Sequence, residues 1–312
     1  MNPTEIKLAL SSLGGRANKK LGQHFLIDPA ALQSIVDAAD IQPNDRVLEI
    51  GPGLGVLTGA LIERGASIIA IEQDRRFIEY LTDLFLTPPS PLMLRGGSDR
   101  PVRTPLTIRG AGALKQNGGK FHILHGDAAR LDWNELVGDS PWKFVSNLPY
   151  SITSLALRKA LWSPRPPSKV VVLVQREVAE RAIANSSPSG SPSVRGRAKT
   201  SLLSLMVALA SRSARIVKRV PAGAFYPPPK VESAILSIDP LSIAERQKKW
   251  GIDPERVMSL AKRGFAHPRK FLASNLGLAD PSILESIGLD RRVRAEDLSP
   301  EQWVELTKGI KE

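Results

Sequence analysis

The sequence predicts an α/β domain built on a doubly wound parallel sheet, followed by a small all-helical domain. The sheet is predicted by short apolar runs, several of which end at a glycine, an acid or a polar residue. The helical domain is predicted because strand-like runs stop near residue 240 and several later segments begin at proline. With 312 residues, the chain has room for two ordinary domains and a sizeable core.

Two strand–helix units open the predicted sheet. Residues Arg46–Ile50 form a short apolar run that stops at glycine, as buried strands do, and a helical stretch through Arg64 follows. Residues Ser67–Glu72 predict a second strand, and Asp74–Leu86 predict an amphipathic helix. Two such units in succession imply parallel strands joined by right-handed crossovers.

Further elements follow from the same patterns. Three more strands are predicted at Phe121–His125, Lys143–Asn147 and Lys169–Gln175. Beyond Asp239, short helices are predicted at Pro254–Phe265, Arg269–Leu276, Pro281–Ile287 and Pro300–Gly309. We therefore expect a loose basic lead-in over residues 1–18, a ligand-binding α/β domain over 19–240 and a basic helical domain over 241–312.

Two stretches of the α/β domain have the composition of exposed loops. Residues Thr87–Gly119 carry five prolines and six glycines without apolar periodicity, which predicts a flexible insertion. Residues Asn185–Lys199 have a similar composition. We assign no site to either stretch, because solvated charges are the usual content of such loops.

The overall charge favours a polyanionic partner. The 43 lysines and arginines exceed the 31 acids, giving a formal net charge of +12. Such a charge fits nucleic acid, ribosomal or anionic-membrane association. The longest apolar runs, Val170–Val174 and Leu202–Ala210, are well short of the roughly 20 residues that span a bilayer. The polar amino-terminal region does not resemble a secretory signal, so we expect a cytoplasmic protein without a membrane segment.

Metal and thiol chemistry are disfavoured by the composition. The chain has no cysteine, which excludes disulfides, thiolate zinc sites, iron–sulfur clusters and cysteine nucleophiles. His122 and His125 lie on a predicted strand at a spacing that turns their rings to opposite faces. We therefore predict no metal site.

A nucleoside-binding site is predicted at the carboxyl edge of the sheet. Residues Gly51–Gly55, Gly-Pro-Gly-Leu-Gly, form a turn in which the backbone can approach a ligand closely. The spacing differs from the dinucleotide fingerprint, whose last glycine lies one position later. Glu72 is placed to accept hydrogen bonds from ribose hydroxyls, and Asp127 to accept one from an adenine amine. This set favours S-adenosylmethionine over NAD.

A chemical site is predicted at the end of the strand Lys143–Asn147. The exocyclic amine of adenine is a poor nucleophile, and its two hydrogens need acceptors as it attacks a methyl carbon. The side-chain oxygen of Asn147 and the carbonyl of Leu148, held by Pro149, can accept them, so that positioning and electrostatics carry the catalysis. Tyr150 is placed to stack on an unstacked base, and Phe225 is a candidate second stacking face.

Together with other motifs, these residues resemble the S-adenosylmethionine-dependent ribosomal RNA adenine N6-dimethyltransferases. The motifs that carry the resemblance are Lys20–Leu26, Glu49–Gly55, Asn147–Tyr150, Phe225–Ser233, Arg269–Leu272 and Asn275-Leu276. The resemblance implies a class I methyltransferase fold, which is Rossmann-like. It also implies dimethylation of two adjacent adenosines near the 3′ end of 16S ribosomal RNA, in the small ribosomal subunit or its precursor, as part of ribosome biogenesis. No obligate protein partner is implied.

The resemblance also assigns site residues. The residues expected to bind the cofactor are Gln23, His24, Leu26, Gly51, Gly53, Glu72, Asp127 and Asn147. Those expected to hold the target adenine are Asn147, Leu148, Pro149, Tyr150 and Phe225. His24 stands where asparagine is also common in the family, so a hydrogen-bonding role is expected there rather than acid–base chemistry.

A cluster of cations marks the helical domain as the RNA-binding part. The residues expected to contact RNA phosphates are Lys262, Arg263, Arg269, Lys270, Arg291 and Arg292. Contacts of this kind position an RNA without reading its bases.

Three other functions remain as alternatives. A 23S ribosomal RNA adenine N6-methyltransferase of the macrolide-resistance type shares the cofactor logic, but the motifs around Phe225 and Arg269 favour the small-subunit enzyme. A noncatalytic ribosome-assembly factor could keep the fold, but the intact residues Asn147–Tyr150 argue against it. A dinucleotide oxidoreductase is the weakest alternative.

Overall fold

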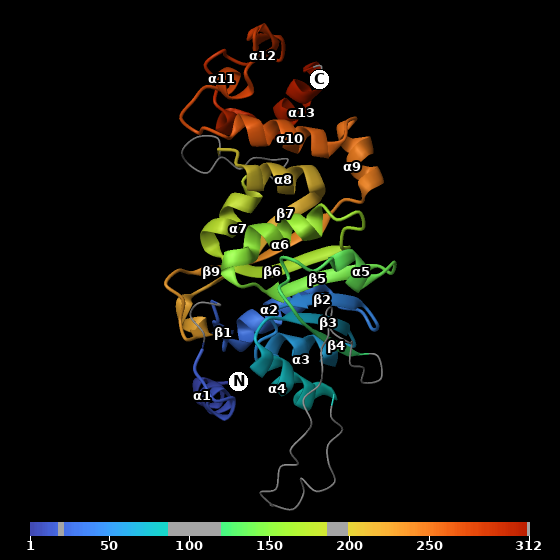
Figure 1. Cartoon of the computed structure of the whole chain (residues 1–312), viewed down its shortest axis with the longest axis vertical. Helices are drawn as coiled ribbons and strands as arrows, with labels where there is room; N and C mark the ends of the chain where they lie inside the picture. Colours follow the sequence, from blue (N-terminus) through green and yellow to red (C-terminus); the bar gives the residue numbers. More distant parts are fainter. Residues whose placement is uncertain (18–21, 87–119, 186–198, 311–312) are drawn as a thin grey trace, which may run out of the picture.

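A seven-stranded sheet forms the centre of the computed structural model, which describes residues 1–17, 22–86, 120–185 and 199–310 (Figure 1). The strand order is β4-β3-β2-β5-β6-β9-β7. The strands of this sheet are β2 (Arg46–Ile50), β3 (Ser67–Glu72), β4 (Phe121–His125), β5 (Trp142–Asn147), β6 (Lys169–Gln175), β7 (Ser211–Val220) and β9 (Ser233–Pro240). A separate antiparallel pair joins β1 (Phe25–Leu26) to β8 (Phe225–Tyr226).

The sheet is mixed rather than wholly parallel. Strands β2 to β6 are parallel, as predicted, and β2, β3, β4 and β6 have the predicted bounds. Strand β9 then runs antiparallel to β6, and β7 runs antiparallel to β9 at the sheet edge. Sequence patterns missed β7 because its outer face carries arginines and a lysine, which interrupt the apolar run; charges of this kind protect edge strands from pairing with other chains.

Helices cover both faces of the sheet. The helices up to the end of the α/β domain are α1 (Pro3–Ser12), α2 (Pro29–Ala39), α3 (Val56–Glu63), α4 (Arg75–Leu86), α5 (Trp133–Val137), α6 (Thr153–Leu161), α7 (Arg176–Ile183) and α8 (Leu202–Ala210). Buried residues of α1 to α4 form one hydrophobic cluster with one face of the sheet, and those of α5 to α8 form a second cluster with the other. Burial on both faces explains why the central strands are mostly apolar, as in the run Val170–Val174 of β6.

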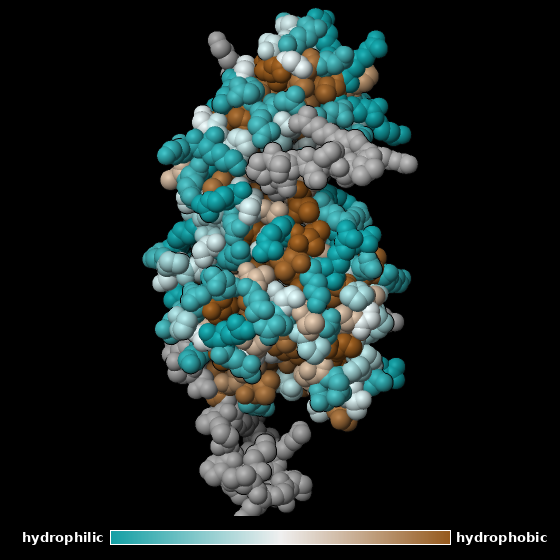
Figure 2. Space-filling view, turned by 180° about the vertical axis from the view of Figure 1, so that it is seen from behind, coloured by the Kyte–Doolittle hydropathy of each residue, from teal (hydrophilic) through white to brown (hydrophobic). Residues whose placement is uncertain are grey.

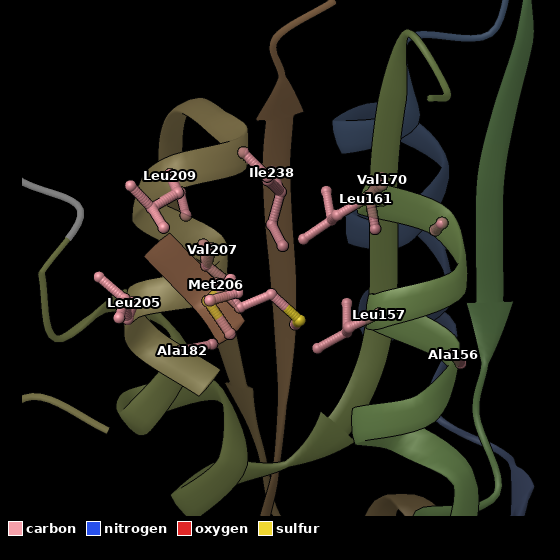
Figure 3. Packing of buried hydrophobic residues seen from close by; sticks show 14 of the residues in the cluster. Ala156, Leu157, Leu161, Val170, Ala182, Leu205, Met206, Val207, Leu209 and Ile238 are labelled. Carbon is pink, nitrogen blue, oxygen red and sulfur yellow. The ribbon is translucent and has the colours of Figure 1, made fainter. Parts of the chain in front are cut away.

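The carboxyl-terminal helices extend the second cluster. They are α9 (Ile243–Trp250), α10 (Pro254–Gly264), α11 (Leu272–Leu276), α12 (Ser282–Ser286) and α13 (Pro300–Gly309). Figure 3 shows side chains of α6 and α8, among them Leu157 and Met206, facing one another over β6 and β9. Val257 of α10 and Trp303 of α13 belong to the same buried cluster. The helical region therefore packs directly on α8 at one end of the molecule (Figure 1).

The amino-terminal lead-in is not loose over its first part. Residues Pro3–Ser12 form α1, which begins at a capping box between Asn2 and Glu5. Ile6 and Leu10, one helical turn apart, are buried in the first hydrophobic cluster. The sequence pattern did not predict this helix, because two apolar residues one turn apart are a weak helical signal in a segment followed by glycines and lysines.

Other expectations concern surface segments. The predicted insertion Thr87–Gly119 and most of the loop-like stretch Asn185–Lys199 lie outside the described residues. Helix α9 was not predicted, although Ser242 and Glu245 form a capping box at its start.

In the part of the chain that the structure describes, no helix is both long and apolar enough to cross a membrane. Figure 2 shows hydrophilic residues over most of one face, with apolar residues gathered near its middle.

Candidate active site

A cleft of about 230 Å³ opens where the parallel strands β2 to β5 end. Loops after β2, β3, β4 and β5 line it, and the amino-terminal segment around β1 closes it from another side. Of the residues predicted to bind the cofactor or the target adenine, those that line this cleft are Gln23, His24, Leu26, Gly51, Gly53, Glu72, Asp127, Asn147, Leu148, Pro149 and Tyr150. The structure thus brings together every predicted residue of these two groups except Phe225.

The glycine turn after β2 supplies backbone to the cleft. Gly51 and Gly53 have φ angles of +66° and +57°, in the left-handed region that favours glycine. A Cβ atom at Gly53 would lie 3.1 Å from the Phe25 ring, so a side chain there would crowd the segment that covers the cleft. The turn therefore leaves open a cradle that larger residues would fill.

Glu72 presents a fixed carboxylate at the end of β3. Its Oε1 accepts hydrogen bonds from the backbone N–H groups of Gln73 (2.7 Å) and Asp74 (2.8 Å), and its Oε2 accepts one from Gly53 (3.2 Å). The side chain is buried, and burial raises the pKa of the Glu72 carboxyl. Each oxygen has lone pairs to spare, so the held carboxylate suits a ribose diol.

Asp127 lies on the next strand end along the sheet edge. Its Oδ1 accepts a hydrogen bond from the Ala129 backbone N–H (2.9 Å), and its Oδ2 lies 3.7 Å from Arg130 Nε. Strands β3 and β4 pair in parallel, with Glu72 opposite His125, so the two acids stand on adjacent strand ends. A cradle of backbone beside two spaced carboxylates fits an adenosine-containing cofactor such as S-adenosylmethionine.

The amide of Asn147 is oriented by the amino-terminal segment. Its Nδ2 donates a hydrogen bond to the backbone carbonyl of His24 (3.2 Å), which leaves Oδ1 as an acceptor in the cleft. The backbone N–H of Leu148 donates to the Leu173 carbonyl on β6 (3.1 Å), so the start of this turn is tied to the sheet. The arrangement fixes where a donor such as an amine N–H can approach.

Tyr150 is held at both its hydroxyl and its ring. The hydroxyl hydrogen-bonds to Ser233 Oγ (2.6 Å), and burial raises the pKa of the Tyr150 phenol, so the ring stays neutral. The His24 ring stacks on it with centroids 5.8 Å apart. His24 is fixed in turn, because its Nδ1–H donates to the Pro227 carbonyl (2.8 Å). Tyr150 also lines the cleft, so its ring stands where a base can meet it.

Phe225 lies outside the cleft. In the antiparallel pair of β1 and β8 it stands opposite Leu26, and only 2% of its surface is exposed. Its ring packs in the first hydrophobic cluster instead of facing the cleft. Phe225 therefore does not line the cleft in this structure, and its role as a second stacking face stays a prediction. Its pairing with Leu26 joins the motif around Phe225 to the amino-terminal segment. Local sequence could not show this, because the pairing joins residues far apart in the chain.

Two acids were not predicted as site residues: Glu49, which lines the cleft, and Asp74, which lies two residues after Glu72. Glu49 on β2 is 1% exposed and accepts a hydrogen bond from Thr58 Oγ1 (2.7 Å). Burial raises its pKa to about 8. Asp74 accepts hydrogen bonds from Arg76 Nη2 (2.6 Å) and from Gln23 Nε2 (3.0 Å), and Arg76 holds the pKa of this carboxyl below its usual range. Asp74 thus anchors the segment that covers the cleft.

The six cations predicted to bind RNA are all exposed. Two of them have partners: Arg263 donates from Nη2 to the Leu276 carbonyl (2.8 Å), and Arg291 binds both oxygens of Glu285 (2.6 and 2.9 Å). The other four have no ion-pair partner among the described residues; they are Lys262, Arg269, Lys270 and Arg292. Among all residues that the structure describes, no group of three histidine, aspartate or glutamate side chains could hold a metal ion.

Comparisons with known proteins show the family of this chain. The sequence model of a family described as "Ribosomal RNA adenine dimethylase" matches residues 14–97 and 107–312, and the unmatched residues 98–106 lie within the predicted insertion. A protein of Dehalococcoides mccartyi named "Ribosomal RNA small subunit methyltransferase A" is 36% identical over 93% of this chain and 87% of its own length. One of the same name from Synechocystis sp. is 37% identical over 94% and 95%.

Solved structures share the fold. A dimethyladenosine transferase from Plasmodium falciparum superposes with a TM-score of 0.63 at 23% identity, covering 91% of this chain and 96% of that one. A 23S rRNA methyltransferase, ErmE, superposes with a TM-score of 0.61 at 22% identity, covering 91% and 98%. The predicted class I methyltransferase fold is confirmed by this likeness.

Proposed function

Because the chain belongs to the ribosomal RNA adenine dimethylase family, we propose that it dimethylates two adjacent adenosines near the 3′ end of 16S ribosomal RNA. The substrate is the small ribosomal subunit or its precursor, and the reaction is a step of ribosome biogenesis in the cytoplasm. The observation that carries the proposal is the amide of Asn147, which donates to the His24 carbonyl and keeps its oxygen for the amine of the target base.

S-adenosylmethionine, when bound, supplies the methyl group. The glycine turn, Glu72 and Asp127 hold the cofactor, and the segment around His24 covers it. The Asn147 Oδ1 and the Leu148 carbonyl accept the two hydrogens of the adenine amine, which directs its lone pair at the methyl carbon. Tyr150 stacks on the base. No general base is needed, because the proton can pass to water after transfer.

The number of methyl groups follows from the amine. An adenine amine has two replaceable hydrogens, so two neighbouring adenosines take four methyl groups in all. The acceptors at Asn147 and Leu148 remain in place after the first transfer, since both belong to a turn tied to β6 and to the amino-terminal segment. A monomethylated amine still has one hydrogen for one of these acceptors.

The names of the sequence relatives, and not the fold, bear on the choice between a 16S and a 23S ribosomal RNA substrate. The TM-scores of 0.63 and 0.61 do not separate the two activities. The relatives that are 36% and 37% identical carry a small-subunit name, which favours the small-subunit substrate.

Methyl transfer from labelled S-adenosylmethionine to unmodified ribosomal particles tests the substrate. We expect N6,N6-dimethyladenosine in the RNA of small subunits that lack the modification, and none in 23S RNA. Product in 23S RNA alone would assign the resistance-type activity. Tight binding to the subunit without any product would instead assign the noncatalytic assembly role.

A further inference from the structure

Phe271 is an unusual exposed aromatic side chain. It is 44% exposed, and no other phenylalanine, tryptophan or tyrosine among the described residues is in the exposed class. It lies in the loop between α10 and α11, directly after two exposed cations, Arg269 and Lys270. Single apolar residues on a surface are common, so its surroundings decide whether the exposure has a use.

The loop that carries Phe271 is held firmly. Asn275 Nδ2 donates hydrogen bonds to the carbonyls of Gly264 (2.6 Å) and His267 (3.1 Å), which spans the loop from both sides. The backbone N–H of Asn275 donates to the Phe271 carbonyl (3.1 Å). The neighbouring Leu272 is fully buried. The exposed side chain of Phe271 is therefore carried by a backbone that these hydrogen bonds hold in place.

The position of Phe271 does not suit phenylalanine on local grounds. It is the N-cap residue of α11, where a serine, threonine, aspartate or asparagine would accept a hydrogen bond from the helix. Phenylalanine makes no such bond there. A residue that breaks a local preference while exposing its ring is expected at a functional surface.

Exposed cations lie on two adjoining segments here, the loop that ends at Phe271 and the stretch that ends at Val293. The backbone N–H of Leu272 donates to the Val293 carbonyl (2.8 Å), which brings the segment containing Arg292 alongside the loop. Arg269, Lys270 and Arg292 have no ion-pair partner in the described part of the chain. An exposed aromatic ring on a surface whose adjoining segments carry cations without ion-pair partners suits an unstacked nucleotide, with the base on the ring and phosphates on the cations.

We propose that Phe271 stacks on an unpaired base of the ribosomal RNA substrate, at a docking point separate from the catalytic cleft. The inference rests on the proposed function for its substrate class. This stacking contact adds to the phosphate contacts of the cations. Salt does not weaken it, and it accepts any base, because every base has a π face. The helical region then binds the base of a single-stranded nucleotide as well as the phosphates of the RNA backbone.

Four variants test this contact by binding to small ribosomal subunits and to naked 16S RNA over a range of salt concentrations. We expect Phe271→Ala and Phe271→Leu to bind at least about fivefold more weakly at every salt concentration, and Phe271→Trp to bind as the wild type does. The dependence of log affinity on log salt should be unchanged in all three. Arg269→Gln should instead lower that slope by about one.

Controls separate stacking from other causes. Ile243→Ala truncates an apolar side chain of similar exposure, 48%, on α9 and should bind RNA as the wild type does. Unchanged S-adenosylmethionine affinity and unfolding midpoint establish that each variant is folded. Wild-type binding by Phe271→Ala or Phe271→Leu would overturn the proposal, as would a loss seen on subunits but not on naked RNA. Absence of methyl transfer by the wild-type protein would refute the proposed function, while the binding comparison would still decide the stacking contact.

Discussion

Glu49 shows how the cleft changes the chemistry of a single residue. Burial, with a smaller contribution from the nearby Glu72 carboxylate, raises its pKa from 4.5 to about 8, although Thr58 stabilises the charged form. Glu49 is therefore protonated in the folded protein at neutral pH. In the unfolded chain it is ionised at the same pH, so the folded state pays to keep it neutral.

The free energy of unfolding should therefore fall as the pH rises from about 4.5 to about 8, because the unfolded chain releases this proton first. Glu49→Gln keeps an acceptor for the Thr58 hydroxyl and removes the titration. We expect the variant to be more stable than the wild type by a few kcal/mol above pH 7, and equal to it near pH 4. Urea unfolding without cofactor, at pH values from 4 to 9, measures the difference. Parallel curves for the two proteins would contradict it.

The positions of residues at strand ends could be predicted from the sequence, whereas the positions of residues that depend on pairing between distant segments could not. Glu72, Asp127 and Asn147 follow apolar runs, and strand ends in doubly wound sheets meet at one edge, so sequence order alone predicts that they converge. The burial of Phe225 was not predictable, because it depends on the pairing of β1 with β8. The roles of Glu49 and Asp74 depend on burial and on partners that sequence patterns do not reveal.

The packing of α10 against α13 leaves no room for a side chain at Gly264. A Cβ atom at Gly264 would lie 2.5 Å from the Trp303 ring and 2.9 Å from Leu272. These distances are shorter than van der Waals contact, and both neighbours are buried in the core. The glycine thus permits the close approach of the two helices.

Gly264→Ala should destabilise the protein by about 1–3 kcal/mol, as overpacking of a filled core does. Gly223→Ala is the matched control, since a Cβ atom there meets nothing within 4 Å. Thermal or denaturant unfolding of both variants measures the effect. Equal loss of stability in the two would refute the close packing of α10 on Trp303.

At the level of elements, the parallel strands were predictable and the antiparallel part was not. Strands β2, β3, β4 and β6 are rich in apolar residues because side chains on both of their faces pack in the two clusters, and their bounds were predicted correctly although Glu49 and His122 interrupt β2 and β4. The edge strand β7 alternates charges with half-buried residues and was missed. Helix α1 was missed because its stability comes from the burial of Ile6 and Leu10 rather than from a long apolar face.

The whole molecule combines an excess of basic residues with a cleft in which two of the acids, Glu49 and Glu72, are buried. The net charge of +12 favours association with RNA, and the acids at the cleft, Glu49 and Glu72, are covered by the chain. The cations of the helical region differ in their freedom to bind phosphate, because Arg291 is engaged by Glu285 and Lys270 has no ion-pair partner among the described residues.

RNA affinity should respond to these two cations differently. Lys270→Gln should weaken binding and lower the salt slope by about one, since one phosphate contact is lost. Arg291→Gln should have a smaller effect, because its charge is already balanced by Glu285. Titrations with small ribosomal subunits between low and moderate salt measure both slopes. A larger effect from Arg291 would show that its ion pair opens when RNA binds.

The most direct test of the account is methyl transfer by Asn147→Ala beside the wild type, with S-adenosylmethionine affinity measured on the same preparations. The wild type should form N6,N6-dimethyladenosine in unmodified small subunits. The variant should lose transfer at least a hundredfold, as loss of a preorganised acceptor does, and should keep most of its cofactor affinity, because the glycine turn, Glu72 and Asp127 remain. Full activity in the variant would contradict the assignment of Asn147 as the acceptor for the adenine amine.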